Sequence, residues 1–159
     1  MALLEANRAN DILLAYWSGR SIPVDPVEIA RSMGVTVRPG NASELNKASG
    51  WYRNNGIPTI IYNTAESKVR QRFTIAHELG HHVLDHGPRP RDTISAFEDP
   101  YDPYEIEANQ FAAELLMPDF ALKILIEKKN VTSLKSLATA FNVSEHAMYI
   151  RLKKLGYIK

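Results

Sequence analysis

The segment FTIAHELGHHVLDHG, residues 73–87, constrains the fold and chemistry of this chain more than any other. Its apolar residues and histidines recur at steps of three and four, which predicts a helix, and Gly87 and Pro88 end it. On a helix, residues four apart lie one above the other, so His77 and His81 can aim two ring nitrogens at one point. Two ligands of a tetrahedral zinc ion require this geometry.

Two neighbours of these histidines strengthen the prediction of a metal site. Glu78 can reach a metal-activated water without binding the metal, so it is the predicted general base. An HExxH pattern also occurs by chance on ordinary surface helices. Here both histidines lie on the apolar side of the helix. Gly80 costs about 1 kcal/mol relative to Ala inside a helix and suits the close approach of another backbone.

A third ligand must come from elsewhere in the chain. There is no cysteine, so any metal must be held by histidine and carboxylate. The segment YEIEANQFAAELLM, residues 104–117, reads as a helix with three glutamates that ends at Pro118. Zinc peptidases usually have three protein ligands. Glu107 falls in line with Gln110 and Glu114, on a stripe expected to be solvated. Glu105 instead shares its face with apolar residues and Asn109.

Glu105 is therefore the predicted third ligand, because a carboxylate on an apolar face is costly unless it is paired or ligated. The alternative is a carboxylate at the start of a helix, stabilised there by the helix dipole. Asn109 lies one turn later on the same face. It is predicted to hydrogen-bond the outer ring nitrogen of a ligand histidine.

Other side chains near this site have weaker claims to a role. His86 is either a favourable charge at the helix C-terminus, which is the preferred interpretation, or a contact to a substrate carbonyl. Tyr101 and Tyr104 lie near Glu105, and either could donate to an oxyanion, although packing is the preferred role. His82 points about 100° away from the neighbouring candidate ligand, so it is expected at the surface.

The rest of the pattern predicts one α+β domain over residues 1–159, mainly helical. Asp25 caps a helix that has Pro26 at its first position and ends near Gly34. The segments VTVRP, ASGWYRNN and PTIIYN read as strands. The last two are joined by a turn at residues 54–56, so we expect a small antiparallel sheet. A first helix is expected over residues 2–18, with a buried side made of Leu3, Leu4, Ile12, Leu13 and Tyr16.

The C-terminal segment SLKSLATAFNVSEHAMYIRLKKLG reads as two helices around a tight turn at Asn142 and Val143. Ser144 is the predicted N-cap of the second helix. This outline is that of a helix-turn-helix, whose second helix would lie in the major groove of DNA. The basic residues available for such a contact are Arg151, Lys153 and Lys154.

Composition argues against several classes of protein. The formal net charge of +1 gives no overall attraction to nucleic acid or to a membrane surface. The N-terminus lacks the basic start and apolar run of a signal peptide. No segment approaches the roughly 20 apolar residues that a membrane span requires. A soluble cytoplasmic protein with no membrane partner is expected. Residues 88–103, rich in Pro and Asp, are expected to form a loop.

Two of these motifs together resemble a known family. RFTIAHELGHHVLDH followed by EIEANQFAAELLMP looks like the ImmA/IrrE family of zinc-dependent metallopeptidases. IPVDPVEIARSMGVTV and GIPTIIYN are similar to its N-terminal helix and central strands, so the resemblance runs from about residue 20 to the end. It implies a zincin-like core over residues 1–120, followed by a helix-turn-helix-like subregion over residues 121–159 within the same domain.

The resemblance also implies an activity. It suggests a gluzincin-like site with one Zn²⁺ per chain on His77, His81 and Glu105, and with Glu78 as the base. Family members are cytoplasmic endopeptidases that cleave a repressor or related regulator of transcription, often encoded on phages and mobile elements. Many carry an extra DNA-binding domain ahead of the peptidase, for which this chain has no room, so direct promoter binding is in doubt.

Peptide-bond hydrolysis in a repressor or antitoxin-like regulator is therefore the main functional prediction. A first alternative is a non-catalytic regulatory or toxin–antitoxin binding module with structural zinc. A second is a DNA-binding regulator that acts through the C-terminal helices. The family includes such a helical pair in the peptidase fold itself, which favours packing or substrate docking over DNA binding. Two histidines and a carboxylate can also hold manganese or iron.

Overall fold

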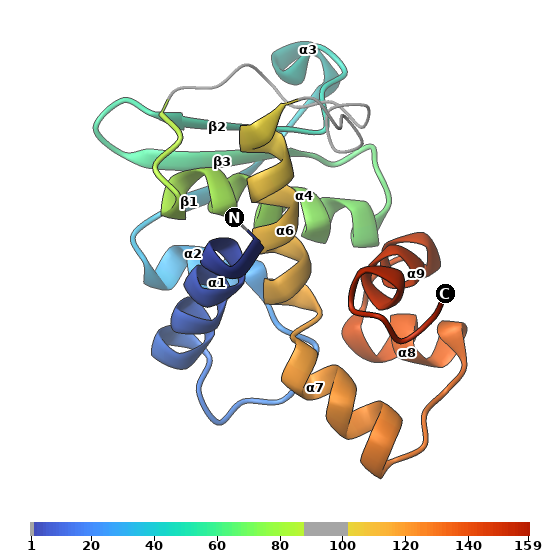
Figure 1. Ribbon diagram of the computed structural model, residues 1–159. Helices are drawn as coiled ribbons and strands as arrows, with labels where there is room; N and C mark the ends of the chain where they lie inside the picture. The colour runs from blue at the N-terminus through green and yellow to red at the C-terminus, as the bar shows by residue number, and fades with distance from the viewer. Residues whose placement is uncertain (1, 88–101) are drawn as a thin grey trace.

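The computed structural model describes residues 2–87 and 102–159, apart from the side chains of residues 2–6. Figure 1 shows a small sheet lying on one side of helix α4, with α6 crossing α4 and leading towards the C-terminal helices. The elements that build this arrangement are α1 (Ala2–Tyr16), α2 (Pro26–Ser32), β1 (Thr36–Gly40), α3 (Ala42–Leu45), β2 (Gly50–Asn54), β3 (Pro58–Asn63), α4 (Lys68–Val83), α6 (Pro103–Leu116), α7 (Asp119–Lys123), the π-helical turn η1 (Ile124–Lys128), α8 (Leu134–Phe141) and α9 (Glu145–Lys154).

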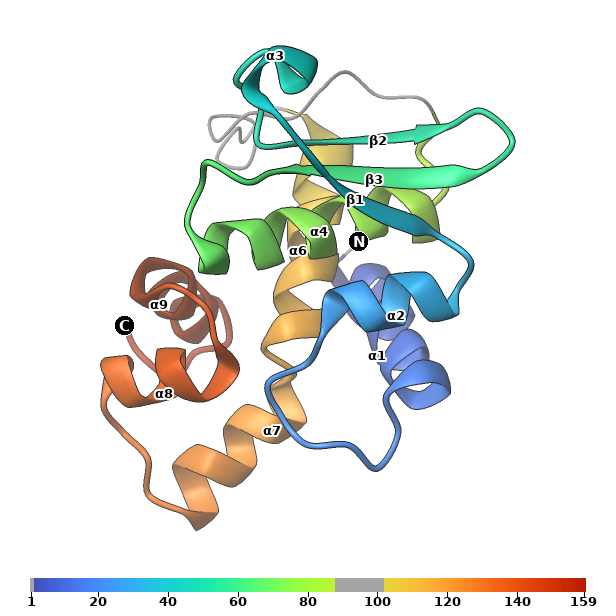
Figure 2. The same cartoon turned by 180° about the vertical axis from the view of Figure 1, so that it is seen from behind.

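The sheet is mixed, which corrects the expectation of an antiparallel sheet. Its strand order is β1-β3-β2; β2 pairs antiparallel with β3 through the predicted turn, but β1 pairs parallel with β3. The physical reason is burial: Ile60 and Ile61, consecutive residues on opposite faces of β3, are both fully buried. A strand that is apolar on both faces belongs in the centre of a sheet. Figure 2 shows the three strands from behind.

The predicted start of the helix at Asp25 is confirmed. The Asp25 carboxylate accepts hydrogen bonds from the backbone amides of Val27 and Glu28, as an N-cap should. Helix α4 begins after Ser67, whose side chain accepts from the Arg70 amide. The predicted helix over residues 104–117 is α6. Most of the predicted loop over residues 88–103 lies outside the described residues.

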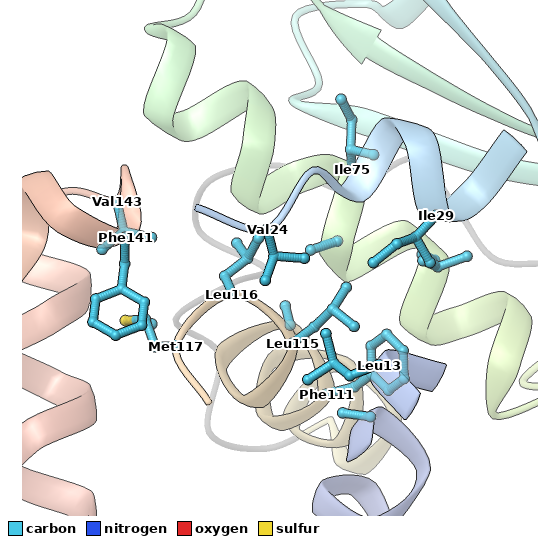
Figure 3. Packing of buried hydrophobic residues seen from close by; sticks show 14 of the residues in the cluster. Leu13, Val24, Ile29, Ile75, Phe111, Leu115, Leu116, Met117, Phe141 and Val143 are labelled. Carbon is cyan, nitrogen blue, oxygen red and sulfur yellow. The ribbon is translucent and has the colours of Figure 1, made fainter. Parts of the chain in front are cut away.

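A single apolar cluster joins α1, α2, α4 and α6 and continues to the C-terminal helices. Figure 3 shows Leu13, Ile29 and Phe111 within it, and Met117 beside Phe141 at its C-terminal end. The buried side of α1 was predicted in part. Leu13 is buried, but Tyr16 is 38% exposed, and Trp17, four residues after Leu13, is buried in its place. The predicted Leu3 and Leu4 lie among side chains outside the described set.

The C-terminal helices follow the predicted outline. Asn142 ends α8 with a positive φ of 55°, and the Ser144 hydroxyl accepts a hydrogen bond from the Ala147 amide at the start of α9. Arg151, however, does not point to solvent. Its guanidinium group forms an ion pair with Glu114 and donates to the Met117 carbonyl, at 3.0 Å, and the residue is 9% exposed. It therefore holds α9 against the end of α6.

Candidate metal centre

Three potential ligand atoms from α4 and α6 converge on one point. His77 Nε2 lies 2.9 Å from Glu105 Oε2, and His81 Nε2 lies 3.1 Å from Glu105 Oε1. The two Nε2 atoms are 3.2 Å apart. Donors bound to a tetrahedral zinc at about 2.0–2.1 Å lie about 3.3 Å from one another, so this spacing fits a zinc ion with small adjustments. The same three residues form a buried group that could hold a metal ion.

The sequence explains why α4 and α6 bring these side chains together. His77 and His81 lie on successive turns of α4 and are fully buried, while Glu105 lies in the first turn of α6 and is 4% exposed. At Gly80, a Cβ atom would stand 3.3 Å from both the Cα and the carbonyl oxygen of Ala108. The close approach expected at Gly80 is thus present, and it sets the separation of the two helices at the site.

The outer nitrogens of both histidines are engaged by other side chains. His77 Nδ1 lies 2.8 Å from Asn109 Oδ1, and an amide oxygen can only accept, so Nδ1 carries the proton. On His81, Nδ1 lies 2.8 Å from His86 Nδ1, and His86 Nε2 lies 2.7 Å from Glu107 Oε2. With Glu107 ionised and His86 neutral, the proton order that satisfies both contacts makes His86 donate to Glu107 and accept from His81.

This proton order leaves the Nε2 lone pairs of both histidines pointing at Glu105. A histidine ligates a metal through its unprotonated nitrogen, and the hydrogen bond at the other nitrogen selects the tautomer. The donor set is therefore arranged as a metal site needs it: two neutral imidazoles and one carboxylate. Nitrogen and oxygen donors of this kind suit zinc.

Glu78 lies between the two candidate histidine ligands in sequence and is fully buried. It faces the start of β2, where a Cβ atom on Gly50 would come within 3.6 Å of Glu78 Cγ and would overlap the Thr74 side chain. Only glycine allows β2 to approach α4 this closely. Sequence patterns could not single out Gly50, because the need for glycine there arises from packing between a strand and a helix that are distant in the chain.

Two predictions about the surrounding histidines are wrong. His82 is half-buried rather than at the surface, with its Nδ1 2.7 Å from the Tyr52 hydroxyl. Burial lowers the pKa of His82 and raises the pKa of Tyr52, so both groups are neutral at pH 7. His86 is not a solvated charge at a helix end, because its side chain is 2% exposed and packed between His81 and Glu107.

The prediction that Glu107 and Glu114 lie on a solvated stripe of α6 is also wrong. The Glu107 side chain is 19% exposed and paired with His86, and Glu114 is 5% exposed and paired with Arg151. Both pairings depend on segments distant in sequence, so helical periodicity could not reveal them. Tyr104 is 47% exposed, with its ring centroid 4.7 Å from that of His86; Tyr101 lies outside the described residues.

Comparison with known proteins agrees with this geometry. Residues 30–153 match a peptidase family described as the IrrE N-terminal-like domain. The chain belongs to this ImmA/IrrE family. A family of metallopeptidases implies a metal, and His77, His81 and Glu105 form a group in which an ImmA/IrrE protein can hold one.

Three relatives show how far the similarity extends. The chain is 31% identical over 103 residues to uncharacterized immunity region protein 2 of Bacillus phage phi105, covering 62% of this chain and 61% of that protein. It is 26% identical over 115 residues to metallopeptidase ImmA of Bacillus subtilis, covering 72% and 68%. It is 34% identical over 93 residues to the radiation response metalloprotease IrrE of Deinococcus radiodurans, covering 54% and 27%.

The match thus spans less than two thirds of the length of the phage protein and about a quarter of that of the Deinococcus protein. The predicted resemblance to the ImmA/IrrE family is confirmed by these matches. Within the described residues, no helix has both the length and the apolar character needed to cross a membrane.

Proposed function

We propose that this chain is a zinc-dependent endopeptidase in which His77, His81 and Glu105 hold the metal and Glu78 is the general base. The observation that carries the proposal is the convergence of three buried side chains. The two histidine Nε2 atoms lie 3.2 Å apart, and each lies 2.9 or 3.1 Å from one oxygen of the Glu105 carboxylate. Three buried ionisable groups with no metal would be costly to place together, because each would lose hydration. A metal ion accounts for their proximity.

A divalent zinc held by these residues supplies Lewis acidity, which polarises a scissile carbonyl and makes a nearby water more acidic. Glu78 takes the proton of the attacking water and delivers it to the leaving amine. The Glu78 side chain is buried and packs against the start of β2, which restricts its motion. Asn109 keeps His77 in the tautomer that leaves Nε2 free to ligate, and His86 with Glu107 does the same for His81.

This proposal changes the role predicted for His86. A contact to a substrate carbonyl requires exposure to the substrate, whereas the imidazole of His86 uses both nitrogens on His81 and Glu107. We assign it to the support of a metal ligand. Tyr104, half-exposed beside His86, remains a candidate donor to an oxyanion on geometric grounds.

The edge of the sheet offers a place for an extended peptide. Among the described strands, β2 lies at one edge, and its first residue packs against Glu78. An extended peptide can add to such an edge through backbone hydrogen bonds. This arrangement would bring a substrate backbone close to the proposed base.

The proposed substrate is a regulatory protein of the cytoplasm, such as a phage or mobile-element repressor or an antitoxin-like regulator. The names of two relatives, an immunity region protein of a phage and metallopeptidase ImmA, support this class. Direct DNA binding through α9 is not favoured, because Arg151 is paired with Glu114 and cannot also reach a phosphate.

The test is co-expression of this chain with a repressor encoded beside its gene. Wild type should cleave the repressor into two fragments, and Glu78→Gln should leave it intact while retaining zinc. The Glu145→Gln variant, altered at an exposed carboxylate of α9, is the matched control and should cleave normally. Cleavage by Glu78→Gln would exclude Glu78 as the base. An intact repressor with zinc-loaded wild type would favour the non-catalytic binding module.

A further inference from the structure

A long groove runs beside α6 and α7, on the far side of Asn109 from the proposed metal. Its volume is about 1440 Å³, which exceeds the roughly 300–1,000 Å³ typical of small-molecule sites. Figure 1 shows α6 and α7 passing between α1 on one side and α9 on the other, and residues of all four helices line the groove. Its size indicates a segment of a macromolecule as the occupant.

The floor of the groove adjoins the metal centre. Asn109 and Ala113 of α6 line it together with the C-cap residue Met117, and their spacing of four places them on one side of the helix. Asn109 is also the side chain that contacts His77 Nδ1, at 2.8 Å. An occupant of the groove would therefore lie directly behind a proposed metal ligand.

Large apolar side chains are exposed around this groove. Leu14 of α1 is 70% exposed, Phe120 of α7 is 59% exposed and Ile150 of α9 is 39% exposed. A single exposed apolar residue is common on protein surfaces. These three come from elements far apart in sequence and line the same hollow, which is typical of an interaction surface. Their burial by a partner would favour association.

The charge of the groove favours an acidic partner. Five basic and two acidic side chains line it, whereas the whole chain has a net charge of only +1. Both acidic side chains already face hydrogen-bond donors. Glu114 is paired with Arg151, and Asp119 accepts from the Tyr157 hydroxyl. The surface that a partner meets is therefore positive.

The cations best placed to meet a partner are two lysines at the rim. Arg20 also lines the groove, but it is paired with Glu28 at 2.8 Å. Lys123 is 57% exposed at its side chain, and its ion pair with Asp119 is longer, with Nζ and Oδ2 3.6 Å apart. Lys154 is exposed on α9. Exposed lysines can select an acidic partner and accelerate its approach, with a modest contribution to affinity.

The walls of the groove indicate a helical occupant. They are mainly helices, whose backbone groups are used internally, and no described strand lines the groove. An extended peptide bound there would leave its own amides and carbonyls without partners. A helix satisfies these groups internally and can place one apolar face into the groove.

We propose that this groove docks an amphipathic helix with an apolar stripe and acidic flanks, carried by the protein that the metal site cleaves. The identity of the partner as substrate rests on the proposed function; the surface itself rests on the exposed apolar side chains and the basic rim. Docking at the groove would hold the substrate on the enzyme while a separate extended segment enters the metal centre.

The test uses the full chain with Glu78→Gln, so that no cleavage intervenes. The probe is a fluorescent peptide of about 20 residues, long enough to form a helix, with a leucine stripe flanked by glutamates. Fluorescence anisotropy should show binding. The double variant Lys123→Glu/Lys154→Glu should weaken it about tenfold, and Phe120→Ser by a similar factor.

Matched controls lie outside the groove. Lys128→Glu/Lys135→Glu reverses two exposed lysines, and Ile57→Ser removes an apolar side chain that is 67% exposed. Neither should change binding of the probe. A second peptide in which lysines replace the glutamates should bind at least about tenfold more weakly than the acidic one.

Three outcomes would overturn the proposal: equal binding of the acidic and basic peptides, binding that is insensitive to the groove variants, or dimerisation of the free chain that Phe120→Ser abolishes. The last would assign the groove to a second copy. Peptide binding is measured without catalysis, so the two proposals can fail separately. If the chain binds the acidic peptide but binds neither zinc nor substrate, only the proposed function is contradicted. If the chain is a zinc-dependent peptidase but does not bind the acidic peptide, only the docking role proposed for the groove is contradicted.

Discussion

The Nδ1 atoms of His81 and His86 lie 2.8 Å apart, so one imidazole must donate to the other. When His86 is neutral and donates its Nε2–H to the Glu107 carboxylate 2.7 Å away, the donor at the shared contact is His81. The Glu107 carboxylate thus orients the ring of His86, and His86 in turn orients the ring of His81. Such outer contacts raise the basicity of a metal ligand and fix its orientation.

His86→Phe should weaken zinc binding because it keeps an aromatic ring of similar shape but removes the acceptor for His81. The expected loss of affinity is about 10- to 100-fold. Competition with a chromophoric chelator measures it. Cobalt substitution should also show an altered visible spectrum. His146→Phe, which changes the exposed histidine of α9, should bind zinc as wild type does. Equal affinities for the two variants would refute the role assigned to His86.

Gly80→Ala should destabilise the fold, although alanine favours a helix by about 1 kcal/mol over glycine. The added Cβ would meet Phe111 at 3.1 Å and the Ala108 backbone at 3.3 Å, and backbone yields little. We expect a net loss of about 1–3 kcal/mol in the free energy of unfolding. Denaturation by urea measures it, and Thr139→Ala, at an exposed position of α8, serves as the control. A more stable Gly80→Ala protein would show that α4 and α6 can separate freely.

Arg151→Met should cost about 3–5 kcal/mol of stability, because it leaves the buried carboxylate of Glu114 without its partner. The double variant Arg151→Met/Glu114→Leu should recover most of the loss, since it removes both charges. Zinc affinity of the double variant should match that of wild type. Urea denaturation of four proteins, wild type, Arg151→Met, Glu114→Leu and the double variant, completes the cycle. An equally destabilised double variant would mean that the hydrogen bond to the Met117 carbonyl matters more than the charge.

Alkaline pH should destabilise the contact between the C-terminus and α7. Burial and the hydrogen bond to Asp119 raise the pKa of Tyr157 from 10.0 to about 12. Because this pKa is higher in the folded state, the Tyr157 hydroxyl keeps its proton to a higher pH in the folded protein than in the unfolded chain. The resulting stability is complete below pH 10 and is lost as pH rises from 10 towards 12. Tyr157→Phe should show a shallower decline across this window in urea denaturation series; a parallel decline would exclude Tyr157 as the cause.

The candidate metal ligands could be predicted because their arrangement is mostly local. His77 and His81 are one helical turn apart, and Glu105 is the glutamate on the apolar face of its own helix. The predictions that failed concern contacts between distant segments. The parallel pairing of β1 with β3 requires that β2 occupy the opposite edge. The burial of Glu107 and Glu114 requires His86 and Arg151.

The metal content of purified protein tests the central claim most directly. Wild type, Glu78→Gln and the exposed-site control Glu127→Ala should each contain one zinc per chain by elemental analysis, and Glu105→Ala should contain almost none. Glu107→Ala should bind more weakly than wild type without losing the site, because it supports His81 only through His86. Zinc retained in full by Glu105→Ala, or absent from correctly folded wild type, would contradict a metal site built from His77, His81 and Glu105.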